Sequence, residues 1–153
     1  YINTPLLNSI SRSNANHLST VLTRIDNSNK KKIGLIGLTF KPGTDDLRHS
    51  PSVALVEALT GKGYVVKIFD ENIQMNKIIG QNKSYIETSL PHISDLLVNS
   101  LNELVNETEL IVITQAATNL ETLIQEEPSV EFFDVCRAIK NVDMFDNLTG
   151  LSW

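Results

Sequence analysis

The hydrophobic positions of the chain fall into two alternating patterns. Continuous apolar runs, typical of strands buried on both faces, occupy 33–38, 64–69, 110–114 and 130–135, and a shorter run at 142–145 suggests an edge strand. Segments with apolar residues at helical spacing lie between them, at 51–62, 100–106 and 118–128. Strands that alternate with helices predict an α/β fold, here a Rossmann-like doubly wound parallel sheet.

A long helix over 5–26 is expected ahead of the first strand. Pro5 suits its first turn, and seven apolar residues lie at helical spacing on one face: Leu6, Leu7, Ile10, Leu18, Val21, Leu22 and Ile25. A helix in this place is outside the repeating β-α pattern. It either covers the sheet or is the end of a helix that connects two domains. Residues 71–99 are less regular, and short helices are predicted at 73–79 and 83–90.

Local signals mark where three of the predicted helices begin. Ser50 is a natural N-cap before Pro51, and Ser100-x-x-Glu103 has the spacing of a capping box. Thr118 is expected to cap the helix that ends before Pro128.

The most informative stretch is 34–51, where the first predicted strand runs into a polar loop and then a helix. Lys41 and Arg48 lie at the two sides of this loop, and together they are suited to hold phosphate groups. Alternatively, Arg48 pairs with Asp45 or Asp46 and holds the loop in shape. The two interpretations are compatible.

This loop lacks the fingerprint of a dinucleotide site. Gly34 and Gly37 form G-x-x-G, and no third glycine opens a helix, so the tight turn that sets a pyrophosphate on a helix N-terminus is missing. Asp70 follows the second predicted strand, where a ribose-binding acid would lie, but a single acid is weak support. The sequence therefore argues against NAD binding by this chain.

Composition excludes several other classes of function. The 153 residues carry a net charge of −5, with a pI near 5.1, which argues against nucleic-acid binding. There is one cysteine, the three histidines lack metal-ligand spacing, and apolar runs are far shorter than a membrane span. We expect a cytoplasmic protein with no metal site and no membrane partner. The chain begins at Tyr1 rather than Met, which suggests a piece of a longer protein.

Cys136 is the only thiol, and it follows the fourth predicted strand. We expect a lone cysteine in this place to be a small buried hydrophobe. No base accompanies it in the sequence, which argues against a role as a nucleophile. His49 is the only histidine beside the candidate loop.

The loop resembles the opening of the C-terminal domain of the UDP-glucose/GDP-mannose dehydrogenase family, whose outline is G-x-x-F-K-x-x-T-x-D-x-R-x-S. The matching residues are Gly37, Phe40, Lys41, Thr44, Asp46, Arg48 and Ser50. The similarity extends over essentially the whole chain, through Gly61-Lys62-Gly63-Tyr64, Ile68-Phe69-Asp70 and Leu90-Pro91-His92-Ile93.

The resemblance implies a fragment of an NAD-dependent nucleotide-sugar 6-dehydrogenase. Residues 1–29 would be the tail of the central dimerisation helix, and 30–153 the UDP/GDP-sugar-binding C-terminal domain, with substrate contacts from Phe40, Lys41 and Arg48. NAD would be bound by an N-terminal domain that this chain lacks. The family's catalytic cysteine lies in a G-x-x-C-x-P-K-D segment that is also absent, so no catalytic residue is assigned and the isolated chain is expected to be inactive.

The chain departs from the family pattern at two places, and the second bears on the substrate. His49 stands where the family usually has Glu. UDP-sugar members often have D-G-R after a late strand, whereas this chain has Asp134-Val135-Cys136-Arg137, with the arginine one residue later. The resemblance therefore favours GDP-mannose, oxidised to GDP-mannuronate in a homodimeric enzyme. The alternatives are a UDP-glucose or UDP-N-acetylhexosamine 6-dehydrogenase domain, and a non-catalytic Rossmann-like binding or assembly module.

Overall fold

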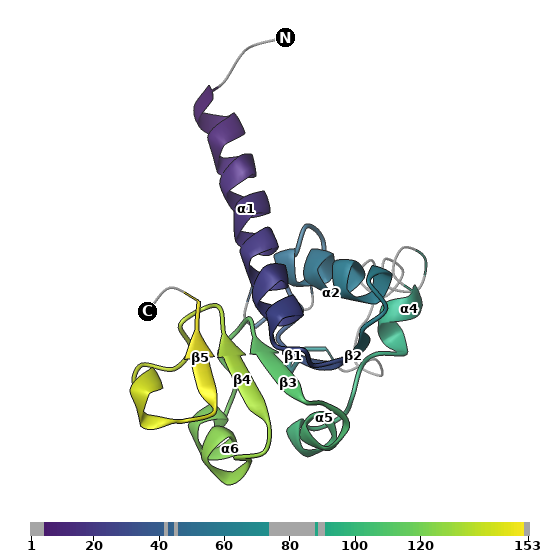
Figure 1. Cartoon of the computed structure of the whole chain (residues 1–153). Helices are drawn as coiled ribbons and strands as arrows, with labels where there is room; N and C mark the ends of the chain where they lie inside the picture. Colours follow the sequence, from purple (N-terminus) through teal and green to yellow (C-terminus); the bar gives the residue numbers. More distant parts are fainter. Residues whose placement is uncertain (1–4, 42, 45, 74–87, 89–90, 152–153) are drawn as a thin grey trace. The chain divides into compact units, whose positions relative to one another are not determined.

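The structure is a computed structural model that describes residues 5–41, 43–44, 46–73, 88 and 91–151 (Figure 1). The chain divides into two compact units, Tyr1–Lys30 and Lys31–Trp153. The helices predicted at 73–79 and 83–90 fall almost entirely outside the described residues.

The second unit is built on a parallel sheet of five strands in the order β2-β1-β3-β4-β5. This order confirms the predicted doubly wound sheet, because the chain adds β2 on one side of β1 and then β3, β4 and β5 on the other. The three inner strands β1, β3 and β4 are buried along their length except at the first residues of β1 and β4, as expected for strands covered on both faces. The strand bounds are Lys32–Ile36, Val65–Phe69, Leu110–Ile113, Glu131–Asp134 and Leu148–Gly150 for β1 to β5.

Helices cover both faces of the sheet. Figure 1 shows α2 (Pro51–Gly61) on one side and α5 (Leu101–Glu107) and α6 (Leu120–Glu126) on the other. A core cluster between the sheet and α5 and α6 includes Ile111 and Phe132, both almost fully buried. The short α4 (Pro91–Ser94) precedes a single bridge from Leu97 to Ile68.

Two of the predicted caps form as expected, and one is wrong. The Ser50 hydroxyl accepts a hydrogen bond from the Ser52 N–H, and the Ser100 hydroxyl accepts one from the Glu103 N–H. Thr118 does not cap α6: the N-cap is Asn119, which adopts a left-handed conformation with φ of 62°. The Thr118 N–H instead donates to the Glu71 carboxylate.

The predicted edge strand at 142–145 is also wrong. Val142–Met144 is a short 3-10 helix, and the fifth strand is β5, further along the chain. Because β5 has only three residues, it leaves no recognisable period in the sequence.

The first unit contains one long helix, α1 (Pro5–Asn27), which agrees with the predicted bounds. Ile10 is half exposed, whereas Val21 and Ile25 are buried. No helix of the described residues is long and apolar enough to cross a membrane.

Candidate functional site

The strand order has a switch point where β1 and β3 lie side by side, because the chain leaves their carboxyl ends in opposite directions. Ligands of open α/β sheets bind at such a point, outside the carboxyl ends of the strands. Three polar residues reach it: Asp70 after β2, and Thr114 and Gln115 after β3. The polar loop singled out in the sequence begins at the same edge, directly after β1.

Asp70 ties the end of β2 to the end of β1. Its Oδ2 accepts hydrogen bonds from the N–H groups of Leu38 and Thr39, at 2.7 and 3.0 Å, and its Oδ1 accepts from the N–H of Asn72. The side chain is buried, and both oxygens are occupied. The carboxylate therefore shapes the start of the loop, and a ribose would have to compete with backbone groups for it.

Gln115 reaches across from β3 to the same residue of the loop. Its Nε2 donates to the carbonyl oxygen of Thr39 and, at 3.1 Å, to the Thr39 hydroxyl. Close packing beneath this contact requires a glycine at position 37, where φ is +96° and an added Cβ would lie 2.6 Å from the Gln115 Cβ. Gly37 thus serves the approach of β3, and it is not part of a dinucleotide turn.

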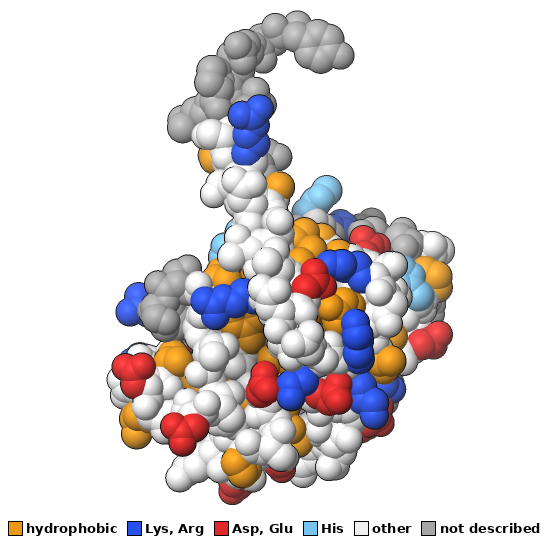
Figure 2. Space-filling view, in the orientation of Figure 1, with side chains coloured by type: hydrophobic (Ala, Val, Ile, Leu, Met, Phe, Trp, Pro, Cys, Tyr) orange, Lys and Arg blue, Asp and Glu red, His pale blue; other side chains and the backbone are white. Residues whose placement is uncertain are grey.

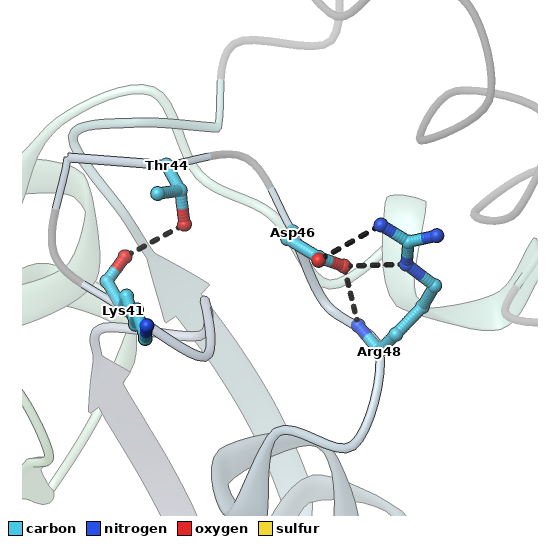
Figure 3. Close-up of polar contacts among 4 residues, drawn as sticks. All are labelled: Lys41, Thr44, Asp46 and Arg48. Atoms are coloured by element: carbon cyan, nitrogen blue, oxygen red, sulfur yellow. Dashed lines mark hydrogen bonds and ion pairs between the residues drawn. The ribbon is translucent and has the colours of Figure 1, made fainter.

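The loop itself is closed by short-range hydrogen bonds (Figure 3). The Phe40 N–H donates to the Asp46 carbonyl, and the Thr44 hydroxyl donates to the Lys41 carbonyl. At its far end the buried Ser50 hydroxyl donates to the Leu38 carbonyl, 2.7 Å away, while it also caps α2. The two ends of the loop are therefore joined at the sheet edge.

Arg48 forms an ion pair with Asp46, as one of the two interpretations of the sequence predicted. Its Nε and Nη2 donate to the two carboxylate oxygens at 2.8 and 2.9 Å, and its backbone N–H donates to Oδ1 (Figure 3). These hydrogen bonds lower the pKa of Asp46 from 3.8 to about 2, the side-chain bond from Arg48 being the largest cause. Asp45 lies outside the described residues.

Phe40 and Lys41 present their side chains to solvent. The Phe40 side chain is 51% exposed, although a large aromatic residue is normally packed. The Lys41 ammonium has no polar partner within the part of the chain that the structure describes. In Figure 3, Lys41 and Arg48 lie on opposite arms of the loop, so the structure does not bring these two cations together around one point.

A second loop at the same edge follows β4. The fully buried Asp134 organises it by accepting hydrogen bonds from the N–H groups of Cys136 and Ile139. Arg137 is exposed and left-handed, with φ of 60°. Cys136 is exposed rather than buried, so that prediction was wrong. Desolvation by the surrounding protein and the Asp134 carboxylate raise the pKa of its thiol to about 12, which disfavours the nucleophilic thiolate.

Among the residues that the structure describes, two hollows are large enough to hold a small ligand. One, of about 350 Å³, lies between the loops after β3 and β4 and is lined by Ala116, Ala117, Asn119, Leu120, Glu121, Thr122, Ala138 and Ile139. The other, of about 510 Å³, is larger but includes Leu110 and Glu131, which begin their strands. It therefore lies at the edge opposite the polar loops. The smaller hollow is the better candidate for a ligand site, because it lies beside the polar loops at the carboxyl edge of the sheet.

A protein-family model matches residues 34–145, which include most of β1, all of β2, β3 and β4, and both loops, but not β5. It describes the UDP-binding domain of the UDP-glucose/GDP-mannose dehydrogenase family. The chain belongs to this family. The resemblance noted in the sequence is thereby confirmed, and the loop from Gly37 to Ser50 lies inside the matched region.

Relatives in the family act on different nucleotide sugars. The GDP-mannose 6-dehydrogenase of Pseudomonas aeruginosa is 43% identical over 125 residues, which cover 82% of this chain and 29% of that protein. The UDP-glucose 6-dehydrogenase of Rickettsia bellii is 33% identical over 99 residues, which cover 59% of this chain and 23% of the relative. The chain thus spans about three tenths of the length of the first of these enzymes.

Solved structures of family members share the fold. A ternary complex of GDP-mannose dehydrogenase from Pseudomonas aeruginosa superimposes with a TM-score of 0.88 at 37% identity, over 99% of this chain and 35% of that chain. UDP-glucose dehydrogenase from Pyrobaculum islandicum gives a TM-score of 0.66 at 20% identity, over 95% and 32% of the two chains. The second likeness supports the fold alone.

Within this family domain, the three residues predicted to bind substrate all lie on one loop. Phe40 and Lys41 are on its first arm and Arg48 is on its second. Sequence reasoning missed Gln115, whose partner Thr39 is 76 residues away, and missed the part that Asp134 plays in the second loop. The available signal in both cases was a polar residue at the carboxyl end of a buried strand or just beyond it.

Proposed function

We propose that this chain is the nucleotide-sugar-binding part of a longer NAD-dependent dehydrogenase that oxidises GDP-mannose to GDP-mannuronate. The observation that carries the proposal is the 43% identity to a GDP-mannose 6-dehydrogenase over 82% of the chain, together with the match to the family's UDP-binding domain. The weaker and shorter similarity to a UDP-glucose 6-dehydrogenase keeps a UDP-sugar as the second candidate substrate.

The nucleotide sugar would lie along the carboxyl edge of the sheet, against the loop from Gly37 to Ser50. Phe40 offers an exposed aromatic face, and the ammonium of Lys41 is available for a negatively charged phosphate oxygen. The hollow between the loops after β3 and β4 has one charged lining residue, Glu121. A diphosphate bound near it therefore requires a cation from elsewhere on this edge, and Lys41 suits that role.

Arg48 serves the same site through the shape of the loop. Its planar guanidinium is already engaged with both oxygens of Asp46. We therefore assign Arg48 to holding the arm that faces Lys41, and the direct contacts with substrate to Phe40 and Lys41.

NAD would be bound by another domain of the complete protein. This chain has no G-x-G-x-x-G fingerprint, and Asp70 is occupied by backbone N–H groups of the loop. The high pKa of Cys136 also disfavours its use as the thiolate nucleophile of an oxidation. The isolated chain, mixed with GDP-mannose and NAD, should therefore produce no NADH absorbance.

Residues 1–29 are proposed to be the end of a central helix that joins two copies of the enzyme. Only three of the 23 residues of α1 are charged, and Figure 2 correspondingly shows few red or blue side chains along it. Depletion of charge is typical of the core of an interface. Ile10→Glu in the complete protein should then shift its sedimentation from dimer to monomer; an unchanged dimer would argue against this role.

Isothermal titration of the chain with GDP, UDP and NAD tests the proposed function. GDP should bind more tightly than UDP, and NAD should give no measurable heat. Tightest binding to NAD would overturn the assignment, and tighter binding of UDP than GDP would transfer it to a UDP-sugar dehydrogenase. A gene that encodes neither the glycine fingerprint nor the cysteine segment upstream of this region would favour a non-catalytic binding module.

A further inference from the structure

We propose that Gln115 is a positioning residue for the nucleotide sugar, which holds Thr39 so that Phe40 and Lys41 leave the sheet in one fixed direction. The inference rests on the proposed function, because it concerns the loop assigned there to substrate binding. It assigns a task in ligand binding to a residue that follows β3 and belongs to neither of the two polar loops.

The first support is that every polar group of Thr39 is occupied. Its N–H donates to Asp70, its carbonyl oxygen accepts from the Gln115 amide, and its hydroxyl is within hydrogen-bond distance of the same amide. Thr39 is only 2% exposed. A residue fixed by its N–H, its carbonyl and its side chain has little freedom to rotate, so the chain direction after it is determined.

The second support comes from the two residues that come after Thr39 in the chain. These are Phe40 and Lys41, and both are exposed. The Phe40 N–H is tied to the Asp46 carbonyl at 2.8 Å, so the arm is held on both sides of the Thr39–Phe40 peptide bond. The side chains that would meet a ligand therefore extend from an anchored base, which lowers the entropic cost of binding.

The third support is that Asp70 and Gln115 have different roles, although both form hydrogen bonds with Thr39. Asp70 is buried and joins the ends of β1 and β2, so its loss would disturb the sheet itself. Gln115 is only partly buried, and it borders a small cavity together with Gly37, Asp70 and Ala117. That cavity holds about 10 Å³, room for roughly one water molecule. The amide of Gln115 is thus in place to orient the loop, and no ligand fits beneath it.

A double-mutant cycle in the complete protein tests the inference. The variants are Gln115→Met, which keeps the length of the side chain and removes its amide, Lys41→Ala, and the two combined. We expect Gln115→Met to raise the KM for the nucleotide sugar roughly fivefold, the scale of one net hydrogen bond, with the KM for NAD unchanged. In the background of Lys41→Ala the same change should raise the sugar KM by a smaller factor than in the unmodified enzyme, because one of the two residues that Gln115 positions is gone.

The control is Gln125→Met, the same substitution at an exposed site on α6, which should change neither KM. An unchanged sugar KM in Gln115→Met would overturn the inference, and so would effects of Gln115→Met and Lys41→Ala that multiply in the double variant. A rise in both KM values would also overturn it, since it would mark general damage to the fold. If Lys41→Ala alone leaves the sugar KM unchanged while Gln115→Met raises it, the proposed role of the loop fails, and Gln115 acts by another route.

Discussion

Asp46 and Arg48 are two residues apart, and the geometry between them decides how the loop is held. An arginine that donates through two nitrogens to both carboxylate oxygens fixes the orientation of the pair as well as its distance. The pair is partly exposed, so its value lies in the shape it gives the loop rather than in the stability of the whole domain.

The ion pair should make Asp46 titrate unusually low. Its lowered pKa means that the contribution of the pair is fully present above the ordinary pKa of 3.8 and is lost as the pH falls toward about 2. Nuclear magnetic resonance of the Asp46 carboxyl carbon should give a midpoint near 2, and in Arg48→Met the midpoint should return toward 3.8. A midpoint near 3.8 in the unmodified chain would show that the ion pair does not persist in solution.

The role assigned to Arg48 can be separated from direct contact with substrate. If Arg48 acts only through Asp46, then Asp46→Asn and Arg48→Met in the complete protein should raise the sugar KM by similar factors, roughly threefold to tenfold. Steady-state kinetics measures both. A much larger effect of Arg48→Met would place the guanidinium on the ligand.

Cys136 should be a slow thiol despite its exposure. Its pKa of about 12 leaves almost no thiolate at about pH 8, so alkylation by iodoacetamide should be far slower than that of the same chain unfolded in urea. Cys136→Ser should leave activity of the complete protein unchanged. Rapid alkylation of the folded chain would contradict the proposed environment of the thiol.

At the scale of the elements, the position directly after β1, Gly37, has a backbone conformation and close packing that only glycine tolerates. Gly37→Ala should lower the free energy of unfolding by ~2–3 kcal/mol, because it adds a strained φ and a collision with Gln115. Urea unfolding of the chain measures the change. Gly43→Ala separates the two causes, since φ there is +76° and, apart from the adjacent residues, no atom of the described residues lies within 4 Å of the added Cβ, so only a loss of ~1 kcal/mol is expected. Equal losses in the two variants would remove the packing argument.

Elements with a local signal were predictable, and those fixed by distant partners were not. The long apolar runs gave β1 to β4, and Ser50 and Ser100 gave two helix starts. Asn119 was missed because its left-handed cap leaves no side-chain hydrogen bond to anticipate. Thr118 looked like the better cap, yet its N–H is taken by Glu71, 47 residues away.

The candidate site shows the same division. The pair of Asp46 and Arg48 was foreseen because both residues are close in sequence. The function of Asp70 and Gln115 was not foreseen, because each is more than 30 residues from its partner Thr39. These contacts form only where the ends of three strands come together. The sequence indicated which loop to examine, and the fold explains why it has its shape.

At the scale of the whole molecule, the chain has the features expected under the proposed function, in which it binds the nucleotide sugar and another domain binds NAD. It has a parallel sheet whose strand order reverses between β1 and β3, a loop with an exposed aromatic residue and an available lysine, and no fingerprint for NAD. Substrate binding and cofactor binding should then respond independently to changes in this chain.

Steady-state kinetics of Lys41→Ala in the complete protein tests that claim most directly. Lys32→Ala is the matched control, since Lys32 is an exposed lysine at the start of β1, on the opposite edge of the sheet. We predict that Lys41→Ala raises the KM for the nucleotide sugar roughly tenfold, as expected for the loss of a charged contact, with the KM for NAD unchanged and Lys32→Ala silent. A sugar KM equal to that of the unmodified enzyme, or a rise in the KM for NAD instead, would contradict the account.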